Sequence, residues 1–252
     1  MKKFELTTEF ITNVLGKKLF RIKALIEFGN VKAGELGGYV EKEGNVSQGG
    51  NAWVYGDARV YGDAWVCGNA RVYGDARVSG DAWVCGNARV YDDAWVSGNA
   101  RVYGDARVCG DAWVSGNARV YGNARVYGDA WVCDDAWVCD DAWVCGNARV
   151  YGNARVYGDA WVCGNARVYG DAWVSGNADY ALVQGFGTEF RCTTFYRGKN
   201  KKIMVNCGCF HGDLEEFRKQ VKETRSGKIA KEYLMIADLM EYHFASEDSS
   251  NE

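Results

Sequence analysis

Residues 52–78 read AWVYGDARVYGDAWVCGNARVYGDARV, and the same six-residue pattern continues without a slip to Ala178. Alanine occupies every sixth position from Ala52, 22 times in all, and valine does so 21 times from Val54 to Val174. In an extended segment alternate side chains face opposite sides, so alanine and valine share one face, whereas Trp or Arg and then Tyr, Cys or Ser share the other. The pattern predicts many short strands, each with one buried face.

A glycine followed by aspartate or asparagine closes each unit and predicts a bend. Glycine and asparagine tolerate positive φ, and aspartate or asparagine can bond its own backbone, so the chain would turn a corner every six residues. Three corners close a triangular coil of 18 residues. At a strand spacing of about 4.8 Å, the repeat then forms a prism of about seven coils, roughly 34 Å long.

The unit resembles that of hexapeptide-repeat proteins, in which an aliphatic residue and, four positions later, a small residue fill the interior of a left-handed parallel β-helix. Here those pairs are Val54 with Ala58 and Val60 with Ala64, and they continue to Val174 with Ala178. The resemblance covers half of the chain. We therefore expect a mainly β fold, a left-handed parallel β-helix of about seven triangular coils with an N-terminal β cap and a C-terminal ββαα cap.

The flanking segments are expected to cap the open ends of the solenoid, because an uncovered strand edge promotes aggregation. We predict an N-terminal β cap with an irregular first coil in residues 1–50, the solenoid in 51–178, a hairpin with two helices in 179–246, and a disordered tail in 247–252. One hairpin is expected in residues 4–28 about Gly16 and Lys17, and a second in residues 181–210 about a four-residue loop, 198–201. Asp213 and Glu216 predict a capping box for the first helix.

Bulk composition narrows the classes of function. The chain is 48% apolar and 25% charged with a net charge of −3, so it lacks the basic excess typical of nucleic-acid binding. Its first residues lack the unbroken apolar stretch of a signal peptide, and no run of 18 apolar residues predicts a membrane span. We expect a cytoplasmic protein whose ten cysteines are mostly free thiols.

The outward position after each alanine forms three columns, one on each face of the predicted prism, and they hold all ten tryptophans. A large Trp is mostly followed two residues later by Cys or Ser, and Arg by Tyr. Two interpretations stay open: the side chains tile the outer wall, or the exposed rings contact a partner or another copy. The columns are Trp53, Arg71, Arg89, Arg107, Arg125, Trp143, Trp161; Arg59, Arg77, Trp95, Trp113, Trp131, Arg149, Arg167; and Trp65, Trp83, Arg101, Arg119, Trp137, Arg155, Trp173.

One coil combines acidic and aromatic residues and carries no basic residue between Arg125 and Arg149. Such an acidic belt could receive a basic partner surface or a divalent cation, or it could reflect drift within a duplicating repeat. A second acidic line, from Asp57 to Asp129, stacks at strand spacing, where like charges repel unless arginines, ions or water offset them. The predicted partner-binding residues are Trp95, Trp113, Trp131, Trp137, Trp143, Asp129, Asp134, Asp135, Asp140 and Asp141.

The cysteines and histidines suggest little chemistry. Seven cysteines fill small outward positions, and Cys67 over Cys85 and Cys145 over Cys163 lie within the spacing that a disulfide tolerates. If the second hairpin pairs Cys192 with Cys207, then Cys209 and His211 follow on the same face. These four residues, Cys192, Cys207, Cys209 and His211, are a candidate zinc site, with a packed hairpin as the alternative.

Acyltransferases of the hexapeptide-repeat type place a histidine on the solenoid, but the two histidines here, His211 and His243, lie outside the repeat. The sequence also contains no phosphate-binding glycine loop, so it predicts no cofactor and no enzyme activity. Its layout, with GELGGYVEKEGN before the repeat and VNCGCFHGDLEEF after it, resembles small solenoid proteins of phages and prophages of gut bacteria, which are often labelled polymer-forming or cytoskeletal.

That resemblance implies a phage-associated protein that acts in the host cytoplasm, binds a host macromolecule, expected to be a protein, and blocks a defence complex. A structural protein that assembles through its faces or ends is the alternative, and acyl transfer a weaker one. A homo-oligomer stays open. Membrane and nucleic-acid partners are not expected.

Overall fold

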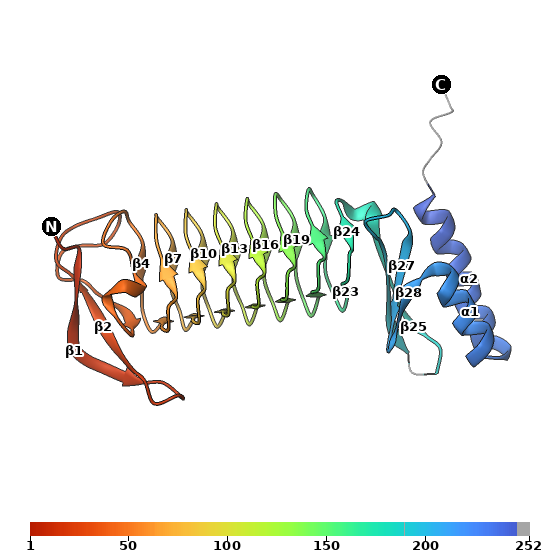
Figure 1. Ribbon diagram of the computed structural model, residues 1–252, viewed down its shortest axis with the longest axis horizontal. Coiled ribbons are helices and arrows are strands. Elements are labelled where there is room, and N and C mark those ends of the chain that lie inside the picture. Colours follow the sequence, from red (N-terminus) through yellow and green to blue (C-terminus); the bar gives the residue numbers. More distant parts are fainter. Residues whose placement is uncertain (189, 246–252) are drawn as a thin grey trace, which may run out of the picture.

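The computed structural model describes residues 1–188 and 190–245 as an elongated body, with β1 (Phe4–Thr12) at one end and α2 (Gly227–Phe244) at the other (Figure 1). A small β cap at one end leads into a stack of short strands, and an antiparallel sheet with two helices covers the other end. The predicted tail, residues 247–252, lies outside the described residues.

Three columns of parallel two-residue strands form the solenoid, seven in each column, and with the irregular first turn they make about eight turns. The first face contains β4 (Trp53–Val54), β7 (Arg71–Val72), β10 (Arg89–Val90), β13 (Arg107–Val108), β16 (Arg125–Val126), β19 (Trp143–Val144) and β22 (Trp161–Val162). The second contains β5 (Arg59–Val60), β8 (Arg77–Val78), β11 (Trp95–Val96), β14 (Trp113–Val114), β17 (Trp131–Val132), β20 (Arg149–Val150) and β23 (Arg167–Val168). The third contains β6 (Trp65–Val66), β9 (Trp83–Val84), β12 (Arg101–Val102), β15 (Arg119–Val120), β18 (Trp137–Val138), β21 (Arg155–Val156) and β24 (Trp173–Val174).

The predicted interior is confirmed for all valines from Val54 to Val174 and all alanines from Ala52 to Ala172, which are buried. The prediction is wrong for Ala178, which is exposed because the chain has already left the repeat for a 3-10 turn. Each valine pairs with the valine 18 residues away, as Val90 does with Val72 and Val108. Burial of one valine contributes about 1.5–3 kcal/mol, so these columns supply most of the stabilisation of a narrow core.

Outside the strand pairs, the backbone hydrogen bonds between turns run from an N–H to a carbonyl of the following turn. The Trp53 N–H donates to the Ala70 carbonyl at 3.1 Å, and the Tyr55 N–H donates to the Val72 carbonyl at 2.8 Å. Within the strand pairs, the parallel register also requires the reverse bond, from the Val72 N–H to the Trp53 carbonyl. Each open end of the solenoid therefore has both carbonyls and N–H groups that need partners, with carbonyls in excess at the N-terminal end and N–H groups in excess at the C-terminal end.

The N-terminal cap is a hairpin followed by an irregular turn. Strands β1 (Phe4–Thr12) and β2 (Lys18–Ala24) pair antiparallel, as predicted. Strand β3 (Leu36–Val40) pairs antiparallel with β2 and parallel with β5, and the short 3-10 helix η1 (Glu43–Asn45) follows. Trp53, the first tryptophan of the repeat, is fully buried beneath Phe4 and Phe28.

Two buried side chains of this cap bind the free carbonyls of the first regular turn. The Asn45 amide donates to the carbonyls of Gly62 and Ala64, at 3.0 and 2.9 Å. The Lys3 ammonium donates to the Ala52 carbonyl at 2.9 Å, and burial lowers the pKa of Lys3 from its ordinary 10.5 to about 8. Neither residue carried a recognisable signal in the sequence.

The C-terminal cap contains an antiparallel sheet in the order β25 (Tyr180–Phe186), β26 (Arg191–Arg197), β27 (Ile203–Cys207) and β28 (Phe210–Asp213). The helices α1 (Leu214–Thr224) and α2 (Gly227–Phe244) pack on one side of it, and Asp213 and Glu216 form the predicted capping box. The sequence predicted only one hairpin here, so the β25 and β28 strands are additions to the expected cap.

Side chains of this cap accept hydrogen bonds from the last turn. The Asn177 side chain, in the 3-10 helix η2 (Asn177–Asp179), accepts from the Trp161 N–H at 2.9 Å. The Thr194 hydroxyl of β26 accepts from the Arg167 N–H at 3.0 Å. The cap also donates, because the Asn206 amide binds the Arg167 carbonyl at 3.4 Å and the Tyr180 hydroxyl binds the Trp161 carbonyl. Both kinds of unpaired backbone group in the last turn thus find partners in the cap.

Candidate interaction surface

The outward columns lie where the sequence predicted them, and their contacts explain the alternation of large and small residues. The Trp95 indole N–H donates to the Ser79 hydroxyl at 3.2 Å, and that of Trp113 donates to Ser97 at the same distance. The Trp161 indole N–H similarly meets the Cys145 sulfur at 3.3 Å. Each of these rings therefore leans over the small residue of the preceding turn, which supports the tiling interpretation.

Trp95, Trp113 and Trp131 follow one another on the second face, and we call them the tryptophan ladder. The first two rings are stacked in parallel with centroids 5.1 Å apart, and the third meets Trp113 edge-on at 5.0 Å. Trp131 is 39% exposed and lies against the Arg149 guanidinium at 4.7 Å. The ladder is thus a continuous aromatic strip that ends in one exposed ring.

The two other predicted tryptophans lie on different faces. Trp137, on the third face, is sandwiched between the guanidinium groups of Arg119 and Arg155, at 4.8 and 4.7 Å from its ring. Trp143, on the first face, contacts Arg125 and Trp161. The structure therefore does not bring the five predicted tryptophans onto one surface.

The acidic belt likewise encircles the solenoid. Asp129 lies at the corner between the first and second faces, Asp134 and Asp135 at the next corner, and Asp140 and Asp141 at the third, all of them exposed. A flat partner can reach one face and its two corners. On the second face this set is Trp131 with Asp129, Asp134 and Asp135.

Within the belt, some aspartates have a local structural role. Asp134 and Asp140 replace corner glycines at φ values of +59°, and each accepts a hydrogen bond from the corner glycine N–H of the next turn, Gly152 or Gly158. Asp135 accepts from the Asn117 amide at 3.0 Å. Within the described residues Asp129 accepts no such hydrogen bond, so both of its carboxylate oxygens are available to a partner.

The cysteine pairs predicted to stack do so and are bonded. Cys67 and Cys85 form one disulfide and Cys145 and Cys163 form another, with Cα atoms 4.7 and 4.6 Å apart. Each joins adjacent turns of the solenoid. The other repeat cysteines, Cys109, Cys133 and Cys139, are free thiols whose pKa is raised by burial.

The register predicted for the candidate zinc residues is wrong. Strand β26 pairs Thr193, not Cys192, with Cys207, because the loop contains five residues, 198–202, rather than four. A shift by one residue moves a strand side chain to the opposite face. Cys192 accordingly faces the solenoid, where its thiol meets the Asn165 carbonyl at 3.4 Å, whereas Cys207 lies on the helix side.

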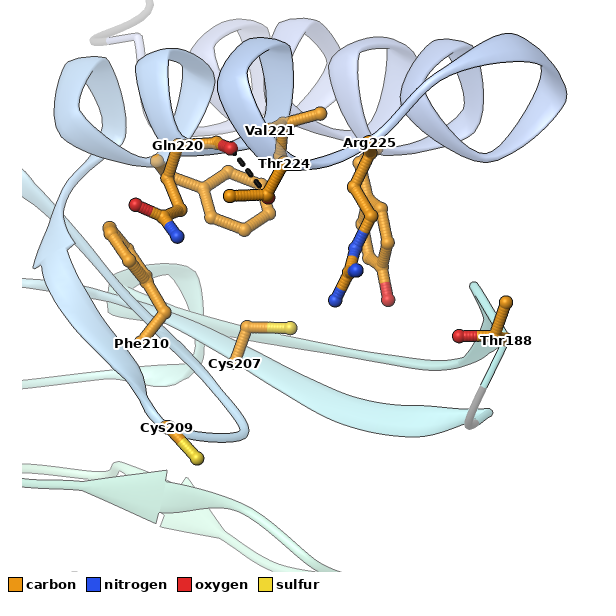
Figure 2. A pocket seen from close by; sticks show the side chains of 10 residues that line it. Thr188, Cys207, Cys209, Phe210, Gln220, Val221, Thr224 and Arg225 are labelled. Carbon is orange, nitrogen blue, oxygen red and sulfur yellow. Dashed lines mark hydrogen bonds between the residues drawn. The ribbon is translucent and has the colours of Figure 1, made fainter.

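His211 also faces the solenoid, with its ring 4.0 Å from that of Tyr169, and burial lowers its pKa. Figure 2 shows Cys207 pointing into the space beneath α1 and Cys209 pointing away from that helix. The four residues thus do not converge. Within residues 1–188 and 190–245, no group of three or more His, Cys, Asp or Glu side chains could hold a metal ion.

Between α1 and the turn that joins β27 to β28 lies a pocket of about 270 Å³ (Figure 2). Arg225 extends into it from the end of α1, with Thr188 on the opposite side and Phe210 at one wall. The Arg225 guanidinium has no carboxylate partner in the described parts of the chain. Such a lining suits a small anionic group, and the sequence did not single out any of these residues except the cysteines.

Comparison with known proteins supports the same architecture. Nine segments match the family model described as YdcK beta solenoid repeat, namely residues 52–68, 70–86, 82–98, 94–110, 100–116, 118–134, 142–158, 148–164 and 160–176. The chain is a β-solenoid repeat protein. The matched segments of this β-solenoid protein fall within the stacked strands and leave both caps outside.

No curated protein matches this β-solenoid protein. Of the residues that the structure describes, none belongs to a helix long and apolar enough to cross a membrane. The outer wall therefore has to be interpreted from its own geometry.

Proposed function

We propose that this β-solenoid protein is a non-enzymatic binding protein that engages a protein partner through the tryptophan ladder and the aspartates at its corners. The observation that carries the proposal is the exposed edge of the ladder, where Trp131 is 39% exposed beside Asp129, Asp134 and Asp135. Aromatic residues dominate the energetics of protein interfaces, and acidic side chains around them select a basic partner surface.

The capped ends favour a binding protein over one that assembles end to end. Asn45 and Lys3 donate hydrogen bonds to backbone carbonyls at one end, and Asn177 and Thr194 accept hydrogen bonds from backbone N–H groups at the other. A solenoid whose ends are satisfied in this way offers its faces for contact. Its inter-turn hydrogen bonds make those faces rigid, which lowers the entropic cost of association.

The finer parts of the proposal rest on the sequence resemblance. They are a left-handed coil of the hexapeptide-repeat type, a phage origin, action in the host cytoplasm and inhibition of a defence complex. Assembly through the faces is the second candidate. Acyl transfer is weaker, because His211 is packed against Tyr169 and its pKa is lowered by burial.

The test begins with capture of a partner from a bacterial lysate and continues with a matched pair of variants. Trp131→Arg uses a residue that the repeat itself places in this position, so we expect the fold to persist. It should weaken partner binding about tenfold or more. Trp83→Arg is the control, since Trp83 is 44% exposed on the third face and also has one Trp and one Arg neighbour.

Binding would be measured by calorimetry, and melting temperatures would confirm that both variants fold. Loss of binding in Trp131→Arg alone supports the proposed surface. Equal binding by the two variants and the wild type would reject the ladder as the contact. If the captured partner binds only through residues on the caps, the proposal is likewise overturned.

A further inference from the structure

The first face carries a regular pattern of charge in four consecutive turns. Each of these turns contributes an arginine, then a tyrosine or cysteine two residues later, then an aspartate two residues after that. Neither other face keeps the arginine and the aspartate together for four turns. We call this surface the charge stripe: Arg71, Tyr73 and Asp75; Arg89, Tyr91 and Asp93; Arg107, Cys109 and Asp111; Arg125, Tyr127 and Asp129.

Each column of the stripe is held in register by the strands beneath it. Arg89 lies beside Arg71 and Arg107 in the parallel ladder, and Arg107 lies beside Arg125. The rings of Tyr73 and Tyr91, between the charged columns, are stacked in parallel 4.8 Å apart. Four like charges at this spacing repel one another on both sides of the stripe.

Neither charged column is neutralised within the described residues. In residues 1–188 and 190–245, no ion pair joins any arginine of the stripe to a carboxylate, and the four aspartates accept no hydrogen bond. The other corners differ, because their asparagines bridge adjacent turns: the Asn69 amide donates to Asn87, and that of Asn87 donates to Asp105, both at 3.0 Å. Among the described residues, the aspartate corner has no such amide donors. The arginine column and the aspartate column are therefore both available to opposite charges from another molecule.

We propose that the charge stripe is the contact between two copies of this chain, which lie side by side and parallel about a two-fold axis along the solenoid. Rotation about this axis exchanges the left and right sides of the contact face and leaves the position of each turn along the solenoid unchanged. The arginine column of each copy then faces the aspartate column of the other, in register at every turn. An antiparallel pair would instead place arginine against arginine, so charge complementarity selects the parallel arrangement.

A second copy fits the charge stripe better than a polyanion does. A polyanion would neutralise the arginine column alone, whereas a second copy places opposite charges against both columns with the same spacing. The stripe ends at the buried Trp53 on one side and at Trp143 on the other, and a hollow of about 370 Å³ beside Tyr55 and Arg71 can receive side chains. One face is small beside the roughly 1,200–2,000 Å² that stable dimers bury, so we expect micromolar association that salt weakens.

The inference does not rest on the proposed function, although the two surfaces meet at the aspartate corner. The tryptophan ladder lies on the second face, outside the charge stripe, whereas Asp129 belongs to both surfaces and is therefore left unchanged in every test variant. Trp131→Arg should therefore leave self-association unchanged, and reversal of Arg89 and Arg107 should leave partner binding unchanged. The two proposals can fail separately.

Charge-swapped variants provide the test. Arg89→Glu with Arg107→Glu should give a monomer, because acidic columns then face each other, and Asp93→Lys with Asp111→Lys should give a monomer for the converse reason. An equimolar mixture of the two variants should form a heterodimer, because each acidic column then faces a basic column again. Sedimentation velocity would measure mass, and the wild-type dissociation constant should rise about tenfold between about 0.05 and 0.5 M salt.

Arg101→Glu with Arg119→Glu on the third face is the matched control and should dimerise like the wild type. A monomeric wild type at millimolar concentration, or a mixture of folded variants that stays monomeric, would overturn the proposal, as would binding of a polyanion without self-association. If the swapped variants do not fold, cross-linking of the wild type decides. Cys109 lies near the proposed axis, so a short bifunctional thiol reagent should yield a Cys109–Cys109 linked peptide, and its absence counts against the dimer.

Discussion

Asn45 illustrates how one buried side chain can complete a strand ladder. It is fully buried, and its amide donates to the Gly62 and Ala64 carbonyls while its oxygen accepts from the Lys42 N–H at 2.9 Å. Asn45→Ala should lower the free energy of unfolding by about 3 kcal/mol, because two carbonyls lose their partners. Denaturant unfolding would measure this, and Asn51→Ala is the control.

Asn51 is exposed and its amide donates only to Asn69, at 3.0 Å, so its removal should cost less than about 1 kcal/mol. Equal losses in the two variants would mean that Asn45 does not act through the buried carbonyls.

The sequence could predict that valine and alanine lie inside, because their period is local. It could not predict Asn45 or Lys3, since the carbonyls they bind lie 17 to 49 residues away.

At the scale of elements, corner residues decide how turns stack. Gly98 has a φ of +64°, and a Cβ there would lie 3.0 Å from the Gly116 nitrogen and 3.1 Å from its oxygen. We expect Gly98→Ala to lower stability by about 1–2 kcal/mol. Gly98→Asp should cost less, because Asp92, Asp134 and Asp140 adopt the same conformation and accept from the glycine N–H of the next turn.

Thermal melting of the two Gly98 variants would rank them, and an alanine variant more stable than the aspartate variant would contradict this account.

The regular strands and their 18-residue register were predictable, because each turn repeats the same signal. Strands β25 and β28 were not, because their alternation is weak and they pair with neighbours through tertiary contacts. The Cys192 register failed for a related reason: one extra loop residue reverses a strand face, and no sequence signal sets the length of that loop.

For the molecule as a whole, the two ends of the solenoid are complementary strand edges. The backbone groups left unpaired on the first turn are those that every later turn pairs with its predecessor, so an uncapped solenoid would complement itself from head to tail. The caps cover both edges. Their presence explains why a repeat suited to unlimited stacking can exist here as a body of about eight turns.

Removal of one cap at a time tests this complementarity. A chain that lacks residues 1–51 exposes the first strand edge of the solenoid, and one that lacks residues 177–252 exposes the last. Each alone should resist head-to-tail growth because its other end stays covered, whereas an equimolar mixture should form a one-to-one complex. Light scattering would measure the masses, with the full-length chain as control. A mixture that remains at the masses of its folded components would show that complementary strand edges do not direct assembly, and that the caps act only as local packing.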